Sequence, residues 1–400
     1  MKRLGSVFLL LLVLSGCIPT VPLNDRAMVR AVAVDLLEDG TYQMTLQVNE
    51  AADGGSQASS PEQTAITETG RDLTELLSKA SISRGKQMFL GSTRLILLGE
   101  RLAEKDILPT LRFFNATQQV APTIAVAVVT GEAGELIRAG EKADQFSADG
   151  ILDVLHKAQE AGYAPASRML EFFSQEESQD GTPQLVLLEM ERHQSEDSSS
   201  KTEKDAVKVS AETSSQEGEK TTRTADKLRV SGTVLFQSGQ IAAHLDPTQT
   251  RGLQWFRERG RMKSTPLSVE LPEGDLIAAK AYLERRRTRV RLENDRPLFT
   301  IQIEAKTAIL ELPEDLEADW KAQVETLQEQ LITSEIQAAL EATMREGWDP
   351  CGLSRLVRQQ EAGYYWDHRN EWENWLSQSA FQVEVSCQVA HTSGTAQQRE

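Results

Sequence analysis

The chain has 400 residues, 40% hydrophobic and 26% charged, which is the balance of a soluble globular protein with room for two or three domains. Its formal net charge of -17 repels phosphate backbones and argues against a nucleic-acid-binding surface. Three cysteines and no Cys-x-x-Cys pair exclude a disulfide-stapled scaffold and give no sign of a zinc ribbon or a thioredoxin-like redox site.

The first segment, residues 1–16, is predicted to be a signal peptide. A positively charged start precedes an apolar run from Val7 to Leu14, which is far shorter than the roughly 20 residues that a helix needs to span a bilayer. Small residues then lead directly into a cysteine, and Leu14-Ser15-Gly16-Cys17 resembles the bacterial lipobox. The resemblance implies that the Cys17 thiol receives a diacylglyceryl group and that cleavage makes Cys17 the new, N-acylated terminus.

The consequence of such a modification is an anchor that does not span the membrane. Each buried acyl CH₂ contributes roughly 0.8 kcal/mol, and two chains hold a protein where one barely does. The mature chain would begin at Cys17, with Ile18 to Leu23 as a short extended tether. The alternative is an ordinary secretory signal in which the cysteine is incidental.

The first predicted domain, residues 17–190, mixes strands and helices. Val29–Leu36 and Tyr42–Val48 flank Glu38-Asp39-Gly40, which predicts a β-hairpin with a tight turn. A Gly/Ser-rich loop follows from Ala51 to Pro61. The later elements are a helix through Leu73 and Ala80, a strand at Leu95–Leu98, a helix around Pro109–Phe114, a strand at Ile124–Val129, helices at Glu132–Ala139 and Gly150–Gln159, and a last strand at Gln184–Met190.

A connector follows at residues 191–227. Charged residues, Ser and Thr dominate it, and Val207 and Val209 are its only bulky hydrophobes between Arg192 and Asp226. Such a segment cannot bury enough apolar area to offset the entropy of ordering it, so we predict a disordered acidic linker or insertion. A phospho-regulated or partner-binding tail is the alternative.

The second predicted domain, residues 228–400, opens with a hairpin, Val230–Phe236 and Ile241–Ala243, around Gln237-Ser238-Gly239. The remaining elements are a helix at Arg251–Arg261, three neighbouring antiparallel strands at Thr288–Leu292, Phe299–Ile303 and Thr307–Leu312 with a turn at Asn294–Pro297 between the first two, a long amphipathic helix at Glu314–Glu346, and a strand at Phe381–Val389 that points Cys387 into a core. The predicted fold class is multidomain α+β, with mixed or antiparallel sheets each packed with helices.

Several stretches of the mature chain stand in a characteristic order and spacing: Val29–Asp35 with Tyr42–Val48, Gly91–Ala103, Val230–Phe236, Thr250–Trp255, and Trp348–Leu353 followed by Trp372 and Phe381. Together they resemble the Ger(x)C spore germination lipoproteins over nearly the whole mature chain. The chain departs from the family pattern at Asn115–Gln119, where an arginine-rich stretch is common, at Cys351, and in its long connector.

The resemblance implies the C subunit of a germinant receptor. Such a protein is a non-catalytic lipoprotein on the outer face of the spore inner membrane, where it assembles with integral membrane A and B type subunits that respond to small nutrients. We expect no cofactor and no metal, because no matching motif is present, and no nucleic-acid partner, because of the net negative charge.

A search for catalytic or metal-binding motifs agrees with a protein that is not an enzyme. The five histidines are scattered without metal-ligand spacing: His156, His193, His244, His368 and His391. The nearest constellations, His244 with Asp246 and His368 beside Asp367, fit exposed or structural histidines better than ligands or bases. No nucleophile elbow or phosphate-cradling glycine loop is present.

One aromatic cluster is a candidate partner interface. Tyr364, Tyr365, Trp366, Trp372 and Trp375 fall close together. A helix from Asn370 to Leu376 would place Trp372 and Trp375 on one face, which favours core packing for that pair. We therefore expect Tyr364, Tyr365 and Trp366 to be the better interface candidates.

A second function remains open from the sequence. A stand-alone solute-binding lipoprotein would capture a small ligand between the two domains. It would show ligand-dependent thermal stabilisation on its own, whereas a receptor subunit would co-purify with multispanning proteins.

Overall fold

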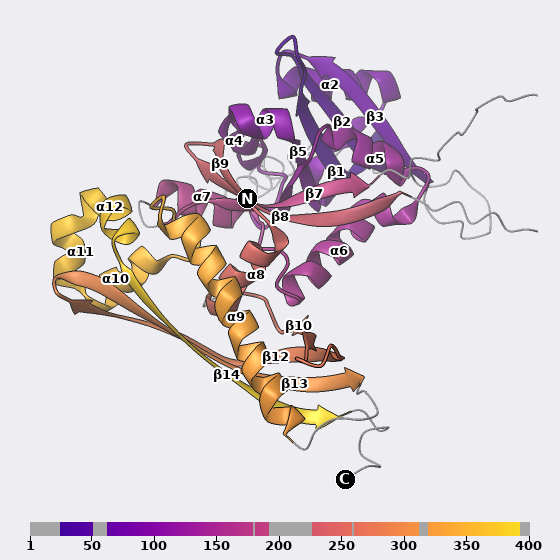
Figure 1. The fold of residues 1–400 in the computed structure, drawn as a ribbon. Helices are drawn as coiled ribbons and strands as arrows, with labels where there is room; N and C mark the ends of the chain where they lie inside the picture. The colour runs from indigo at the N-terminus through magenta and orange to yellow at the C-terminus, as the bar shows by residue number, and fades with distance from the viewer. Residues whose placement is uncertain are drawn as a thin grey trace, which may run out of the picture.

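The computed structural model describes residues 25–50, 62–178, 181–191, 226–257, 260–311 and 319–392. It contains two sheets, each packed with helices, as the predicted α+β class requires (Figure 1). The predicted signal peptide with Cys17, the loop at 51–61 and nearly all of the predicted linker at 191–227 lie outside the described residues.

The first sheet has parallel strands at its centre and antiparallel strands at both sides. Its order is β3-β2-β1-β5-β6-β7-β8-β9, with β4 also paired to β1. The strands are β1 (Arg26–Leu36), β2 (Tyr42–Glu50), β3 (Glu62–Gly70), β4 (Gln87–Phe89), β5 (Leu95–Gly99), β6 (Ala125–Val129), β7 (Gln184–Glu191), β8 (Lys227–Gln237) and β9 (Gln240–Leu245). The predicted β1–β2 hairpin is confirmed by their antiparallel pairing.

Helices cover both faces of this sheet (Figure 1). They are α2 (Leu73–Arg84), α3 (Glu100–Lys105), α4 (Leu108–Ala116), α5 (Ala133–Gly140), α6 (Ala148–Glu160) and α7 (Met169–Glu177), with short 3₁₀ turns η2 (Leu90–Ser92) and η3 (Asp144–Phe146). Ile96 and Leu98 pack into the core under α2, α3, α4 and α7, while Leu95 and Leu97 pack into the core under α5 and α6. Because both faces are buried, β5 is an unbroken apolar run.

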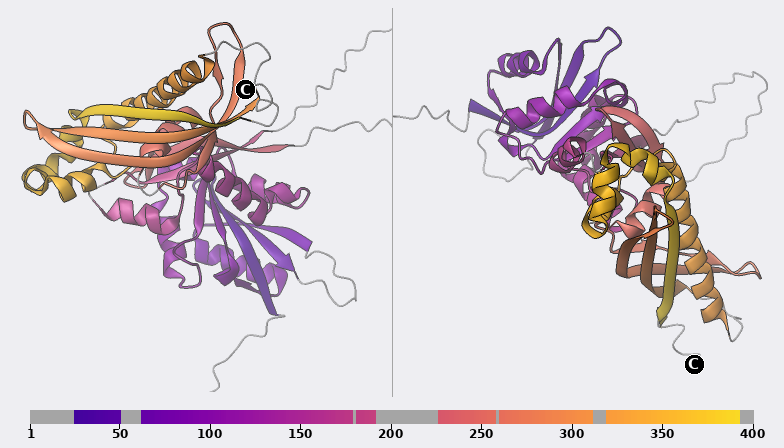
Figure 2. Two further views of the ribbon diagram at one scale, coloured as in Figure 1. Left: turned by 90° about the horizontal axis from the view of Figure 1, so that it is seen from below. Right: turned by 90° about the vertical axis from the view of Figure 1, so that its left-hand side faces the viewer.

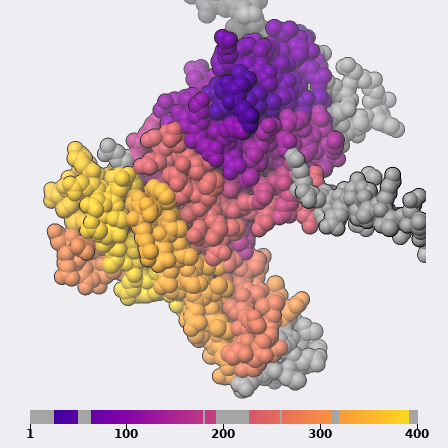
Figure 3. Space-filling model, turned by 45° about the horizontal axis from the view of Figure 1, so that its top comes forward, coloured from indigo at the N-terminus to yellow at the C-terminus, as the bar shows by residue number. Residues whose placement is uncertain are grey.

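The hairpin β8–β9 belongs to this first sheet. Strand β8 pairs antiparallel with β7, so the expectation that Gln184–Met190 is the last strand of the first sheet is wrong. The reason lies in the apolar run of β8. We call the described residues up to Leu245, which hold the first sheet, the first region, and those from Asp246 to Thr392, which hold the second sheet, the second region. Val234 and Phe236 pack into a core of the first region, and Leu235 points the other way into the core of the second region. In Figure 3 the salmon segment that includes β8 lies between the indigo and orange parts of the surface.

The second sheet has the order β10-β12-β13-β14, with β11 paired to β12. Its strands are β10 (Ser264–Pro266), β11 (Val269–Glu270), β12 (Leu276–Glu293), β13 (Arg296–Glu311) and β14 (Ala380–Thr392). Helices pack against one of its faces: α8 (Pro247–Phe256), α9 (Trp320–Met344), α10 (Leu353–Gln360), α11 (Ala362–His368) and α12 (Trp372–Ser377), with the 3₁₀ turn η4 (Arg369–Glu371). Figure 2 shows β12, β13 and β14 running together as a long twisted ribbon.

Two of the predicted strands are parts of one longer strand. Phe299–Ile303 and Thr307–Leu312 were expected to be separate, but β13 runs through both. Buried side chains keep a period of two across the expected break, because Ala305 is buried and charged Glu304 and Lys306 occupy the solvent face. The turn before β13 is shorter than predicted and is made by Asn294 and Asp295, both with positive φ.

Helix boundaries differ from the prediction where capping decides them. Helix α8 begins at Pro247, four residues before the predicted start, because Asp246 and Gln249 form a capping box, and it ends at Phe256. The long helix predicted at Glu314–Glu346 is confirmed as α9 over Trp320–Met344, and residues 314–318 lie outside the described residues. In β14 the predicted alternation is confirmed, with Cys387 buried in the core. Among the residues that the structure describes, no helix is both long and apolar enough to cross a membrane.

Candidate functional site

The junction between the two sheets contains two of the family-like stretches, and the first is Thr250–Trp255 on α8. Gly252 lies where α8 crosses α9, and a Cβ atom there would collide with the backbone carbonyl of Glu335. Only glycine allows this close approach. The crossing brings the side chains of Arg251 and Trp255 onto the Glu335 carboxylate of α9.

A buried ion pair forms at this crossing. The Nε atom of Arg251 donates to Oε2 of Glu335 at 2.9 Å, Nη2 donates to Oε1, and the indole N–H of Trp255 donates to Oε2 at 2.9 Å. Arg251 Nη1 also donates to the hydroxyl of Tyr163, after α6, at 2.7 Å, so the pair joins the first region to the second. Burial lowers the pKa of Arg251, but the hydrogen bonds and charge of Glu335 outweigh it and raise the pKa.

The second family-like stretch, Trp348–Leu353, forms the other half of the junction. The carboxylate of Asp349 caps α10, since it accepts from the backbone N–H groups of Leu353 and Ser354 at 2.8 Å each and from the Ser354 hydroxyl. The side chain is fully buried. Burial raises the pKa of Asp349, and the hydrogen bonds from α10 lower it in part.

Three hydrogen bonds, each with at least one backbone group, tie this stretch to the first region. The N–H of Thr182 donates to the Asp349 carbonyl at 2.9 Å, and the Asp349 N–H donates back to the Thr182 hydroxyl at 2.7 Å. The side-chain amide of Gln184 donates to the Pro350 carbonyl at 2.6 Å. Gln184 begins β7 and Thr182 lies two residues before it, so this contact fixes α10 against the start of an interior strand of the first sheet.

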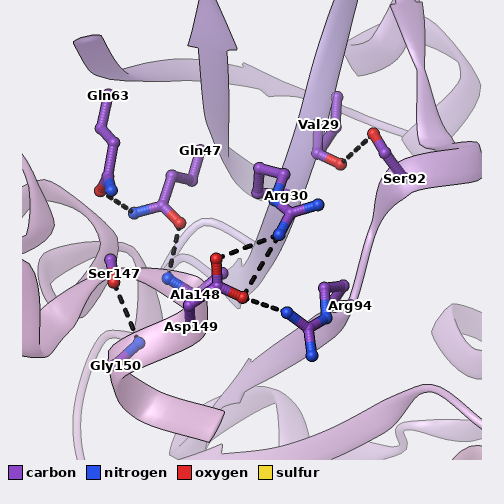
Figure 4. A network of polar contacts seen from close by, with 10 residues as sticks. All are labelled: Val29, Arg30, Gln47, Gln63, Ser92, Arg94, Ser147, Ala148, Asp149 and Gly150. Atoms are coloured by element: carbon purple, nitrogen blue, oxygen red, sulfur yellow. Dashed lines mark hydrogen bonds and ion pairs between the residues drawn. The ribbon is translucent and has the colours of Figure 1, made fainter. Parts of the chain in front are cut away.

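A third polar cluster lies within the first region, on the family-like strand β1. Figure 4 shows Arg30 and Arg94 converging on Asp149, in the first turn of α6. Arg30 Nη2 lies 3.0 Å from Asp149 Oδ2. Beside them, the Gln47 side chain accepts a hydrogen bond from the Ala148 N–H at 2.8 Å. The ion pairs are partly exposed, so they orient α6 more than they stabilise the fold.

Asp35 is the buried acid of the first region. It follows the apolar run of β1, and its two carboxylate oxygens accept from the N–H groups of Ala133 and Gly134 at 2.7 and 2.8 Å, at the start of α5. Burial raises the pKa of Asp35 to about 6, although these two hydrogen bonds lower it in part. A Cβ atom on Gly99 would collide with the carboxylate, which explains the glycine at the end of β5.

The predicted site residues fall into two groups. Cys17 and the lipobox residues Leu14, Ser15 and Gly16 lie outside the described residues. The predicted interface residues Tyr364, Tyr365 and Trp366 are described, and two of the three are core residues. Tyr364 and Tyr365 are buried, while Trp366 is 56% exposed.

The burial of the two tyrosines has a structural cause. Tyr364 stacks on His368 with ring centroids 4.2 Å apart and meets Trp375 edge-on, so α11 and α12 close one core together. The expected core packing of Trp372 and Trp375 is confirmed. Trp366 is therefore the one member of the predicted interface that stays a surface candidate.

The histidine pairs do not form ligand sets. His368 binds the Tyr364 carbonyl through Nδ1 at 2.9 Å, and His244 is exposed while Asp246 caps α8. In the described part of the chain, no group of three or more His, Cys, Asp or Glu side chains could hold a metal ion. Cys351 and Cys387 are both free thiols, and burial raises the pKa of each to about 12.

Sequence reasoning missed the buried acids Asp35, Asp349 and Glu335. A signal for two of them was available, since Asp35 interrupts the apolar run Ala33-Val34-Asp35-Leu36-Leu37 and Asp349 stands between Trp348 and Pro350. A charged residue among apolar neighbours is expected to be buried with a specific hydrogen-bond or ion-pair partner. Glu335 had no comparable signal, because α9 carries many glutamates.

Comparisons with known proteins cover almost the whole chain. A family model described as "Spore germination protein N-terminal domain" matches residues 19–191, and one described as "Spore germination B3/ GerAC like, C-terminal" matches residues 231–393. Spore germination protein GerQC of Bacillus cereus is 20% identical over 99% of this chain and 100% of the relative. Spore germination protein B3 of Bacillus subtilis (strain 168) is 20% identical over 97% of each chain.

The fold also has a counterpart among solved structures. The crystal structure of the GerBC protein superposes with a TM-score of 0.54 and 15% identity, covering 90% of this chain and 96% of that chain. At this identity the likeness is one of fold. It supports the two-region α+β architecture described above.

Proposed function

The chain belongs to the Ger(x)C family of spore germination proteins, and on this premise we propose that it is the lipid-anchored, non-catalytic C subunit of a germinant receptor. In this role it is needed for receptor assembly and for the germination response to small nutrients. It works on the outer face of the spore inner membrane, beside integral membrane A and B type subunits.

The observation that carries the proposal is the lipobox immediately ahead of a folded body. Leu14-Ser15-Gly16-Cys17 ends a short apolar run, and the first strand of the body begins at Arg26. The chain from Cys17 to Arg26 reaches at most about 30 Å when fully extended. Acylation of Cys17 would therefore hold the first sheet close to the bilayer.

A non-catalytic role is supported by how the buried acids are used. Asp35 and Asp349 cap helices, and Glu335 neutralises Arg251. Each of these carboxylates is occupied by donors of the protein itself, which leaves none of the three poised as a general acid or base. Their arrangement favours a body that presents fixed surfaces to partners.

A Cys17→Ala substitution in the native cell tests the proposal. We expect the chain to leave the membrane fraction, the abundance of the assembled receptor to fall and germination by small nutrients to slow severely. The matched control is Ser15→Ala, which keeps a small residue before the cysteine and should leave all three readouts unchanged. A Cys17→Ala chain that stays membrane-bound and supports normal germination would contradict the proposal.

A further inference from the structure

A small cavity lies at the junction of the two regions. Its volume is about 120 Å³, and its walls come from α7, the end of α8, β12 and the α10 segment. Gln175 contributes from the first region, and Arg257, Thr288, Arg355 and Gln359 contribute from the second. The cavity has room for a small molecule, since a single water needs only about 10–15 Å³ of such space.

The polar lining of this cavity is cationic. Two arginines, Arg257 and Arg355, line it, and none of the described lining residues is Asp or Glu. Arg257 is held in place through its backbone, because Arg286 Nη1 donates to the Arg257 carbonyl at 2.6 Å. An anion that entered would meet the positive charges of these two arginines.

Two polar atoms in the lining lack partners among the described residues. Nη1 of Arg257 and Oγ1 of Thr288 are both buried without a hydrogen bond. Thr288 is only 4% exposed, so its hydroxyl cannot turn to bulk water. Buried donors of this kind are rare in folded proteins and mark places where a water, an ion or a ligand completes the bonding.

We propose that this cavity binds a small carboxylate anion between the two regions. The Arg257 guanidinium and the Thr288 hydroxyl would donate to the carboxylate, and the amides of Gln175 and Gln359 would contact the rest of the molecule. This goes beyond the proposed assembly role, which needs no ligand. The sequence left open the capture of a small ligand between the two domains. The cavity is a specific place for that ligand, which would bridge α7 and α10 there.

The experiment measures thermal unfolding of the purified full chain in detergent, with chloride keeping the ionic strength constant. Sodium acetate should raise the unfolding temperature with a saturable concentration dependence, and neutral acetamide of the same shape should not. Phosphate serves as a second, tetrahedral anion. Stabilisation by phosphate but not by acetate, or equal shifts with acetate and acetamide, would overturn the assignment.

Variants separate the cavity from general salt effects. Arg257→Gln should weaken acetate binding at least about tenfold, because it removes a charged donor. Thr288→Val keeps the side-chain shape, should fold at least as well as the native chain, and should weaken binding about threefold. Arg287→Gln, on the exposed side of the same strand, is the matched control and should change nothing. If Arg257→Gln does not fold, undiminished acetate binding by Thr288→Val overturns the proposal, as does an equal acetate shift in native and Arg257→Gln chains.

Discussion

The two sheets bury their side chains in different ways. In the first sheet, every residue of β5 is buried, because helices cover both faces. In the second sheet, β13 alternates buried and outward-facing residues along most of its length, because helices cover one face only. Parallel strands joined by helical crossovers produce the first pattern. A sheet with one solvated face produces the second, and here that sheet is mixed, since β13 pairs antiparallel with β12 and parallel with β14.

The difference shows which parts of the chain rely on polar contacts for their stability. Within each region, apolar packing supplies most of the stabilisation, although Leu235 and Leu245 of the first sheet also pack into the core of the second region. Between the regions, buried acids and the groups that donate hydrogen bonds to them hold α8, α9 and α10 in place against the first sheet. Removing a single charge at the junction should therefore lower the free energy of unfolding strongly. Within the sheets, removing apolar side-chain volume should do so.

The largest expected effect comes from breaking the junction at Glu335. Glu335→Ala leaves Arg251 and the Trp255 N–H buried without their acceptor, and it should lower the free energy of unfolding by about 3–5 kcal/mol. Denaturant titration measures this change. The control on the same helix is Glu341→Ala, which removes an exposed ion pair with Arg345 and should cost about 0.5 kcal/mol or less. Equal losses of unfolding free energy in Glu335→Ala and Glu341→Ala would show that the buried ion pair stabilises the fold no more than an exposed one.

Paired alanine substitutions in the two sheets sharpen the comparison directly. In β5, Ile96→Ala and Leu97→Ala should each cost about 2–5 kcal/mol, because neighbouring residues face two buried cores. In β13, Ile301→Ala should cost as much, but Gln302→Ala should cost about 0.5 kcal/mol or less, because Gln302 faces outward. Unfolding free energies from one denaturant series check all four. A costly Gln302→Ala would mean that this face is covered.

Asp35 makes the first region sensitive to pH. Burial raises its folded pKa to about 6, above the ordinary 3.8, so between these values only the folded state keeps the proton. Its contribution to stability is therefore present at low pH and is lost as pH rises through about 6. Relative to Asp35→Asn, the native chain should lose up to about 3 kcal/mol between pH 4 and pH 7. A pH-independent difference between the two chains would contradict the assigned pKa.

The smallest expected effect is at the cap of α10. Asp349→Ala leaves the N–H groups of Leu353 and Ser354 without an acceptor but also removes a buried charge, so the net cost should be about 2 kcal/mol. Protease sensitivity near α10 should rise with it. Asp319→Ala is the control, since Asp319 is the N-cap residue of α9 but its side chain makes no capping hydrogen bond, and it should cost about 0.5 kcal/mol or less.

Much of this architecture could be predicted from local patterns in the sequence. The alternation in Phe381–Val389 and the spacing in α9 predicted the correct elements. The reason is that burial of one face produces a regular spacing of apolar residues within a single strand or helix. The membership of the β8–β9 hairpin in the first sheet could not be predicted, because strand pairing across the long connector leaves no local trace.

The candidate site was harder to predict than the fold. The spacing of aromatic residues could not distinguish a surface from a core. Tyr364 and Tyr365 are both buried, and Tyr364 meets Trp375 of α12 edge-on. The roles of Arg251 and Asp349 depend on partners 84 residues away at Glu335 and 167 residues away at Thr182. Such partners become neighbours only through the fold.

The central claim is that this body is tied to a membrane through its first mature residue. Mass spectrometry of the N-terminal peptide from the native cell tests it most directly. The account predicts a chain that begins at Cys17 and carries a diacylglyceryl thioether and an N-acyl group. A peptide with a free Cys17 thiol, or one that still carries residues 1–16, would contradict it.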